Sequence, residues 1–135
     1  MSKKVLDLIK KNNVKYVDLR FTDPRVKWQH TAQTAHTITT DTFQNGIMFD
    51  GSSIAGWKSI DKSDMMLMPD PETAVMDPFT AQPQLVLFCD VLEPISREPY
   101  NRDPRSVAKK AEAFLKKSGI GDKAYFGPEA EFFVF

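Results

Sequence analysis

Glu129 and Glu131, two positions apart near the end of the 135-residue sequence, are spaced for metal chemistry. In a β-strand such residues point to the same face, with Cα atoms about 6.6–6.8 Å apart. Two carboxylates beside phenylalanines repel each other and lose hydration, so they need compensating positive charge. Two divalent cations about 4 Å apart would supply it, as in sites that clamp a transferring phosphoryl group. The alternative is an edge strand whose outer face is simply solvated.

A second candidate is the segment Asp50-Gly51-Ser52-Ser53, which places a carboxylate at a tight glycine turn beside two hydroxyls. Such a turn could bind a cation through Asp50, or an anion through its exposed backbone N–H groups. The segment is not a P-loop, because a P-loop requires Gly-Lys-Ser/Thr at the start of a helix. An ordinary Asp-Gly turn without a ligand is the alternative.

The remaining versatile side chains indicate no further site. His30 and His36 have no third ligand at metal spacing, so we expect both on the surface. Cys89, the one cysteine, falls in the apolar run LVLFCDVL and is predicted to be a buried, inert thiol of a cytoplasmic protein. Trp57 lies in a polar loop and would indicate a partner surface if its indole were exposed.

Charge and hydropathy exclude several classes of protein. The 18 basic and 18 acidic side chains cancel, whereas a nucleic-acid binder needs a surplus of Lys and Arg to displace counterions from phosphates. No apolar run approaches the roughly 20 residues of a membrane span, and the start MSKKVLDLIKKNN is no signal peptide. We therefore expect a folded cytoplasmic chain with no nucleic-acid and no membrane partner.

Apolar spacing predicts an α+β fold, with a mixed sheet and short helices in the first hundred residues. Apolar positions three and four apart follow Ser2, which would cap a helix that ends at Asn12-Asn13. Alternation over 14–21 and again over 26–34, with turn residues between, predicts a hairpin. The other expected elements are a short helix from Thr39 or Thr40 to 45–46, and strands within 65–68, 74–76 and 85–92.

A second unit is predicted after residue 103. Residues 94–103 are polar and proline-punctuated, which is typical of a domain linker. Asp103 is a suitable N-cap for a helix that has Pro104 at its first position and Gly119 just past its end. The apolar residues of 124–135 then predict a strand. Because the sequence stops on four apolar residues, we expect this helix and strand to belong to something larger.

Five segments, in order along the chain, together resemble one family, the bacterial-type (type I) glutamine synthetases. Three carry most of the resemblance: KYVDLRFTD (15–23), IMFDGSSIAGW (47–57) and FGPEAEFFVF (126–135). The segments DMMLMPD (64–70) and YNRDPRSVAKKAE (100–112) are similar as well. The match covers essentially the whole chain, although HTAQTAHTITT (30–40) is unusual for the family.

The resemblance implies that residues 1–103 form a β-grasp domain and that 104–135 begin a catalytic domain built on a larger antiparallel sheet. In the family, the residues matching Glu129 and Glu131 bind two catalytic Mg²⁺ or Mn²⁺ ions. The aspartate matching Asp50 helps to bind ammonium and is proposed to take its proton, and Ser53 matches a residue near that site. This loop enters the active site of a neighbouring subunit, in a homo-oligomer of two stacked hexameric rings.

The implied reaction is ATP-dependent amide formation. ATP phosphorylates the side-chain carboxylate of glutamate, and ammonia then displaces phosphate to give glutamine, while the two metals offset the gathered negative charge. An aspartate pKa of about 4 lies far below the about 8–10 of an amine, so Asp50 is first a cation binder and second a base. The other ligands and the nucleotide site would lie beyond Phe135, so we expect the 135-residue chain alone to be inactive.

Two alternatives stay open at this point. Relatives within the family join glutamate to amines other than ammonia, and the pocket that distinguishes these amines is not in this sequence. The chain could instead be a natural short β-grasp interaction module, which inserts its 50–57 loop into a full-length partner without catalysis.

Overall fold

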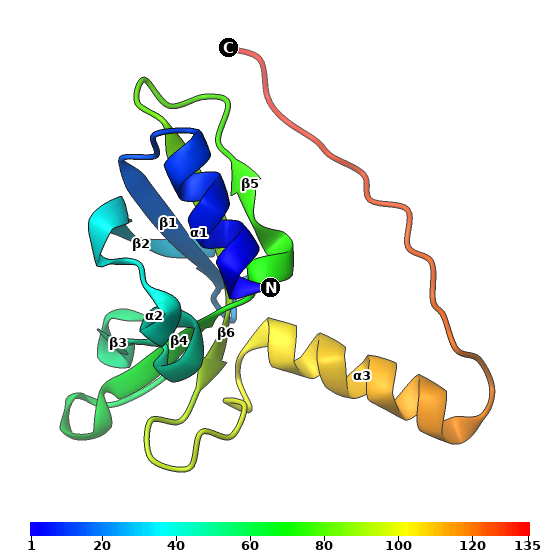
Figure 1. Ribbon diagram of the computed structural model, residues 1–135. Coiled ribbons are helices and arrows are strands. Elements are labelled where there is room, and N and C mark those ends of the chain that lie inside the picture. Colours follow the sequence, from blue (N-terminus) through cyan, green and yellow to red (C-terminus); the bar gives the residue numbers. More distant parts are fainter.

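The computed structural model describes residues 1–135 and contains a six-stranded mixed sheet with three α-helices (Figure 1). The strands are β1 (Tyr16–Thr22), β2 (Trp28–Thr34), β3 (Ile47–Asp50), β4 (Asp64–Pro69), β5 (Val75–Met76) and β6 (Gln84–Leu92). The helices are α1 (Ser2–Lys11), α2 (Thr40–Asn45) and α3 (Pro104–Ser118). The strand order is β2-β1-β6-β4-β3, and β5 also pairs with β6. The predicted α+β class is confirmed.

Strand β6 is the centre of the sheet and makes it mixed. Its first half pairs in parallel with β1, so that Tyr16 lies opposite Gln84. Its second half pairs antiparallel with β4, so that Pro69 lies opposite Cys89. Neighbouring strands thus flank β6 at both edges, and Leu85, Val86 and Leu87 are buried, as the continuous apolar run predicts.

The core lies between α1 and the sheet, and Figure 1 shows α1 in front of β1. Helical spacing places Val5 and Ile9 on the buried face of α1. Strand alternation places Val17, Leu19 and Phe21 on the matching face of β1, where each is at most 4% exposed. The apolar side chains of the helix and of the strand thus form one layer. The burial of such a layer is the main favourable term in folding.

The predicted hairpin of β1 and β2 is confirmed. Its turn is organised by the buried Asp23, whose Oδ1 accepts the backbone N–H groups of Arg25 and Lys27 at 2.9 Å each. Its Oδ2 accepts from the side chain of Gln29, and this hydrogen bond is the main reason that the pKa of Asp23 is lowered. Within the same turn Val26 has φ +64°, a left-handed conformation that a β-branched residue adopts only under strain.

The predicted helix ends are confirmed for α2 and α3, and the predicted end of α1 at Asn12 is confirmed as well, but its predicted start is not. Thr39 caps α2 in a capping box with Thr42. Asp103 caps α3, and Gly119 follows it at φ +71°. In α1, however, Met1 occupies the N-cap position and Ser2 is already helical, so the prediction that Ser2 is the cap is wrong. Helix α1 therefore begins without a side-chain cap, and the burial of its apolar face stabilises it.

The predicted strand over 124–135 is absent, and this expectation was wrong. The segment carries no secondary structure and its side chains are exposed, because no strand of the chain lies beside it to accept and donate its backbone hydrogen bonds. The apolar stripe of α3 is likewise uncovered, with Val107 53% and Phe114 70% exposed. In Figure 1, α3 and the following segment extend away from the sheet. None of the three helices has the length and apolar character needed to cross a bilayer.

Candidate functional site

The carboxylate of Asp50 lies at the end of β3, where the chain leaves the sheet. Its Oδ1 accepts both the backbone N–H of Ser52 at 2.8 Å and the Ser52 hydroxyl at 2.6 Å. Its Oδ2 receives a long contact from the Ser53 hydroxyl, at 3.4 Å, and the Ser63 side chain adds a weaker interaction with the carboxylate. The whole group is exposed to solvent. One oxygen is therefore occupied in shaping the turn, and Oδ2 remains available to an external hydrogen-bond donor.

Hydrogen bonding keeps this carboxylate charged. The Ser52 hydroxyl, followed by the Ser52 backbone N–H, lowers the pKa of Asp50 from its usual value. Donors aimed at a carboxylate favour its ionised form. Asp50 and Ser53, predicted from the sequence as neighbours in one site, are thus brought together, and the arrangement suits a cationic ligand better than an anionic one.

The turn after Asp50 requires glycine. Gly51 is buried, and its backbone N–H donates to the carbonyl of Ser63 at 2.7 Å. A Cβ atom at this position would lie 2.3 Å from the sulfur of Met65 and 2.7 Å from its Cγ. Because Met65 is itself fully buried, it has little room to move aside. The close approach of Gly51 to β4 therefore sets where Asp50 can lie.

The back of the loop is anchored in an aromatic cluster around Trp57, whose indole does not meet the condition for a partner surface. Its indole is 6% exposed, so it is part of the core and does not form a partner surface. The rings of Phe21 and Phe49 lie 5.6 and 6.1 Å from it, and the ring of Tyr100 lies 5.4 Å away. Such contacts favour one position of the loop backbone. The sequence did not reveal this burial, because the neighbouring rings come from distant elements.

Glu129 and Glu131 lie in the exposed segment after α3. Figure 1 places this segment on the opposite side of the view from β3, so the chain does not bring the two glutamates to Asp50. Carboxylate oxygens are the donor type that Mg²⁺ and Mn²⁺ prefer. Nevertheless, no group of three or more potential metal-binding side chains occurs in the structure. The donor chemistry fits a divalent cation, but two ligands do not complete its coordination shell.

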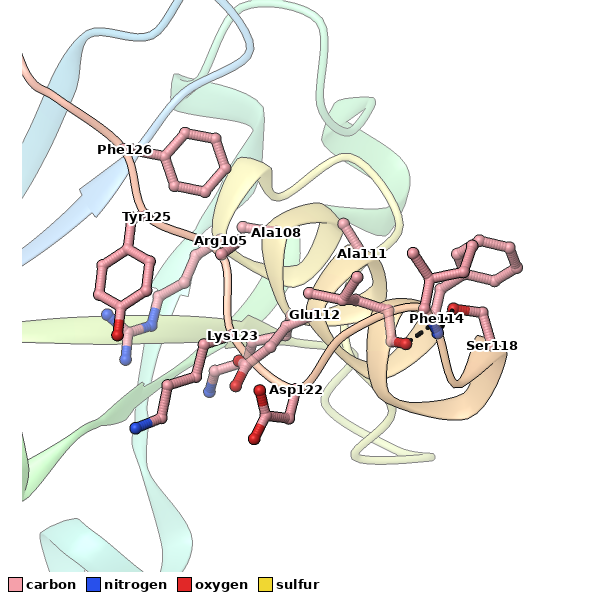
Figure 2. A pocket seen from close by; sticks show the side chains of 14 residues that line it. Arg105, Ala108, Ala111, Glu112, Phe114, Ser118, Asp122, Lys123, Tyr125 and Phe126 are labelled. Atoms are coloured by element: carbon pink, nitrogen blue, oxygen red, sulfur yellow. Dashed lines mark hydrogen bonds between the residues drawn. The ribbon is translucent and has the colours of Figure 1, made fainter.

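A hollow of about 810 Å³ lies between α3 and residues 120–126, and Asp50 is not among the residues that line it (Figure 2). Figure 2 shows Tyr125 and Phe126 on one side of it and Phe114 with Ser118 at the far end of the helix. Its walls are mostly the uncovered apolar side of α3 and mixed charges, without convergent polar groups. We therefore assign no ligand to it.

One cluster of charged residues on the sheet, around Asp18, was not predicted from the sequence. Asp18 is 3% exposed and accepts from Nε of Arg20 at 2.7 Å, while Nη2 of Arg20 donates to Asp77 at 3.0 Å. His30 is exposed, as predicted, and its Nδ1 lies 2.7 Å from the other Asp18 oxygen. The guanidinium of Arg20 offsets the charge of this buried carboxylate, which is a structural role. Cys89 is buried, as predicted, with a pKa raised far above its usual value by burial.

Comparison with known proteins identifies the relatives of this fold. Residues 13–94 match the family model described as glutamine synthetase, beta-Grasp domain, and residues 101–135 match glutamine synthetase, catalytic domain. A glutamine synthetase of Rhizobium meliloti is 65% identical over 131 residues, which are 97% of this chain and 28% of that protein. One of Azospirillum brasilense is 66% identical over 132 residues, which are 98% of this chain and 28% of that protein.

A solved structure agrees with these sequence matches. The glutamine synthetase of Plasmodium falciparum superposes with a TM-score of 0.79 at 25% identity, covering 88% of this chain and 23% of that one. The chain thus spans somewhat more than a quarter of the length of the curated relatives that it matches. Because the β-grasp model alone matches more than half of the residues and the matches agree in sequence and in fold, the chain belongs to the glutamine synthetase family.

Proposed function

We propose that this chain is the N-terminal part of a glutamate–ammonia ligase, which makes glutamine from glutamate, ammonium and ATP through a γ-glutamyl phosphate. Family membership supports the reaction class. The observation that carries the specific role of this chain is the carboxylate of Asp50, exposed, anionic and fixed at the end of β3 with Oδ2 available.

The chain divides into two units in this proposal. Residues 1–103 are the β-grasp domain, and residues 104–135 begin the catalytic domain. The two family matches, which fall on either side of residues 95–100, support this division. The N-cap of α3 at Asp103 supports it as well, because a new element starts there.

Asp50 binds the ammonium ion and orients it. A carboxylate attracts this cation and accepts its hydrogen bonds, and such charge-assisted bonds are stronger than neutral ones. The hydrogen bonds from Ser52 favour the charged form, so they improve cation binding and weaken Asp50 as a proton acceptor. Loss of the ammonium proton must therefore be helped by other groups of the site or be coupled to attack on the acyl phosphate. Ser53 lines the same site, with its hydroxyl 3.4 Å from Oδ2.

Glu129 and Glu131 supply two carboxylate ligands to a pair of Mg²⁺ or Mn²⁺ ions, and their other ligands come from outside these 135 residues. The ions, when bound, neutralise charge on the phosphates of ATP and on the transferring phosphoryl group. The two side chains alternate with apolar residues, so a strand over this segment would direct both toward one face. That strand forms only when a neighbouring strand pairs with it.

The proposal includes an oligomer and a cellular location. The parent enzyme is a homo-oligomer, a dodecamer of two hexameric rings, in which the Asp50 loop contributes to the site of a neighbouring subunit. The exposure of Asp50 and Ser53 in the single chain agrees with a site that is completed by another chain. The reaction takes place in the cytoplasm, where a single buried thiol needs no disulfide partner.

An assay of Asp50→Asn in the full-length enzyme tests the function. The variant keeps the size of the side chain but removes its charge, so we expect the KM for ammonium to rise about tenfold or more, while the KM for glutamate stays constant. Asp61→Asn, at an exposed aspartate in the following loop, is the matched control. An unchanged KM for ammonium in Asp50→Asn would refute the assignment. Faster turnover with methylamine than with ammonium would favour a γ-glutamyl–amine ligase.

A titration with Mn²⁺ tests the metal assignment. In the full-length enzyme, Glu129→Ala and Glu131→Ala should each weaken Mn²⁺ binding and abolish turnover. Glu98→Ala is the control, because Glu98 is an exposed glutamate outside the segment that carries the proposed ligands, and it should change neither property. Unchanged metal binding in both variants would contradict the proposal. The 135-residue chain alone should form no glutamine, and product formation by it would show that the site is complete within these residues.

A further inference from the structure

The far end of the Asp50 loop is held by two side chains that lie just before α3. The hydroxyl of Tyr100 donates to the carbonyl oxygen of Trp57 at 3.2 Å. The Nη1 atom of Arg102 donates to the carbonyl oxygen of Gly56 at 2.6 Å and reaches that of Trp57 at 3.5 Å. Both contacts join the loop backbone to a segment more than 40 residues away in the sequence.

The segment that carries these two side chains is itself firmly held. Tyr100 is 4% exposed, and its backbone N–H donates to the carbonyl of Val91 at 2.8 Å. The next elements after Arg102 are equally fixed, because Asp103 is fully buried and Arg105 bridges Asp70 and Asp90 on the sheet. The exposed Arg102 and the buried Tyr100 therefore connect the loop to a segment that is hydrogen-bonded to β6.

Between Gly51 and Trp57 the buried side chains of Ile54 and Trp57 hold the loop against the core, whereas its backbone makes few hydrogen bonds. The backbone bonds there are short-range, from the N–H of Ile54 to Gly51 at 3.2 Å and from that of Trp57 to Ile54 at 3.1 Å. Bonds over three residues of this kind have poorer geometry than those of an α-helix. Gly56 has a positive φ of 84°, and a Cβ atom at this position would meet no other atom within 4 Å.

We propose that Arg102 and Tyr100 are positioning residues for the ammonium-binding loop, and that they tie the position of Asp50 to the start of α3. The inference rests on the proposed function of Asp50. Its consequence is mechanical: a shift of α3 in one subunit changes the placement of the loop that this subunit provides to a neighbouring site. The two residues act on the backbone carbonyls of the loop and do not touch the substrate.

Hydrogen exchange in the 135-residue chain tests the contact directly. We expect the amides of residues 51–58 to exchange about threefold or more faster in Arg102→Met and in Tyr100→Phe, while β1 and β6 are unchanged. Arg97→Met is the matched control, because Arg97 lies in the same segment but donates to the carbonyl of Gln44, at 2.5 Å, and not to the loop. Tyr100→Phe keeps the buried ring, so it remains decisive if Arg102→Met fails to fold. Unchanged exchange of residues 51–58 in Tyr100→Phe and in a folded Arg102→Met would overturn the inference.

Kinetics of the full-length enzyme separate positioning from simple stability. Arg102→Met should raise the KM for ammonium about threefold or more with the KM for glutamate constant, whereas a lower kcat with every KM unchanged would mean that Arg102 only supports folding, which overturns the inference. If loop exchange rises in Arg102→Met while Asp50→Asn leaves the KM for ammonium unchanged, the proposed function fails and the structural contact stands.

Discussion

Replacing Asp103 with alanine would remove two kinds of interaction at once. Asp103 is fully buried, and its carboxylate accepts the backbone N–H of Arg105 at 3.1 Å and that of Ser106 at 3.2 Å, which caps α3. It also accepts the backbone N–H of Val91 at 3.3 Å, and this buried group would be left without a partner. Loss of a cap costs about 1 kcal/mol and an unsatisfied buried N–H about 1–3 kcal/mol. The free energy of unfolding should therefore fall by about 2–4 kcal/mol.

Urea denaturation followed by circular dichroism measures this loss. With a slope of about 1.5 kcal/mol per molar urea, the midpoint should move down by about 1–3 M. Asp103→Asn should lie between the wild type and Asp103→Ala, because its amide keeps one oxygen for the cap but presents a donor to other donors. Asp122→Ala, at an exposed aspartate, is the control and should not move the midpoint. If Asp103→Ala lowers the free energy of unfolding by less than about 0.5 kcal/mol, this account of how Asp103 holds α3 to β6 is wrong.

Four further measurements test other parts of the structure. The pKa of Asp50, measured by NMR, should lie below its usual value, so the carboxylate should stay charged as the pH falls until that lowered pKa is reached. Ser52→Ala should raise this pKa, because it removes the hydroxyl that donates to Asp50. Gly51→Ala should destabilise the chain by about 1–3 kcal/mol in urea titrations, through the clash described above. Val26→Asn should stabilise it by about 1 kcal/mol, since asparagine tolerates the left-handed backbone. Cys89 should react with a thiol reagent only on unfolding, and rapid labelling of the folded chain would contradict its burial.

Local features could be predicted well from the sequence because their causes are local. The turn at Asp23, the capping box at Thr39 and the ends of α3 each depend on residues within a few positions. The hairpin and the buried run of β6 follow from alternation and from continuous apolarity. The Asp50 turn was recognised for the same reason, since its shape comes from its own serines and glycine.

Features that depend on distant partners could not be predicted in this way. The burial of Trp57 requires rings from β1, β3 and the segment before α3, and nothing near it in the sequence indicates them. The predicted strand over 124–135 has the apolar pattern of a strand, but a strand also needs a neighbour, and these residues have none. Glu129 and Glu131 therefore have the sequence spacing of a metal site, but no strand directs their carboxylates to one face.

The sequence by itself determined the family, the class of fold and the chemical types available, namely one exposed aspartate turn and one pair of glutamates. Only the tertiary structure decided how they are held. It occupies one oxygen of Asp50 and leaves the other available, buries Trp57 beneath the loop, and joins Gly56 to Arg102 across 46 residues. The physical reason is that residue type and spacing set what a side chain can do, whereas direction, charge state and rigidity arise from contacts between segments far apart in the chain.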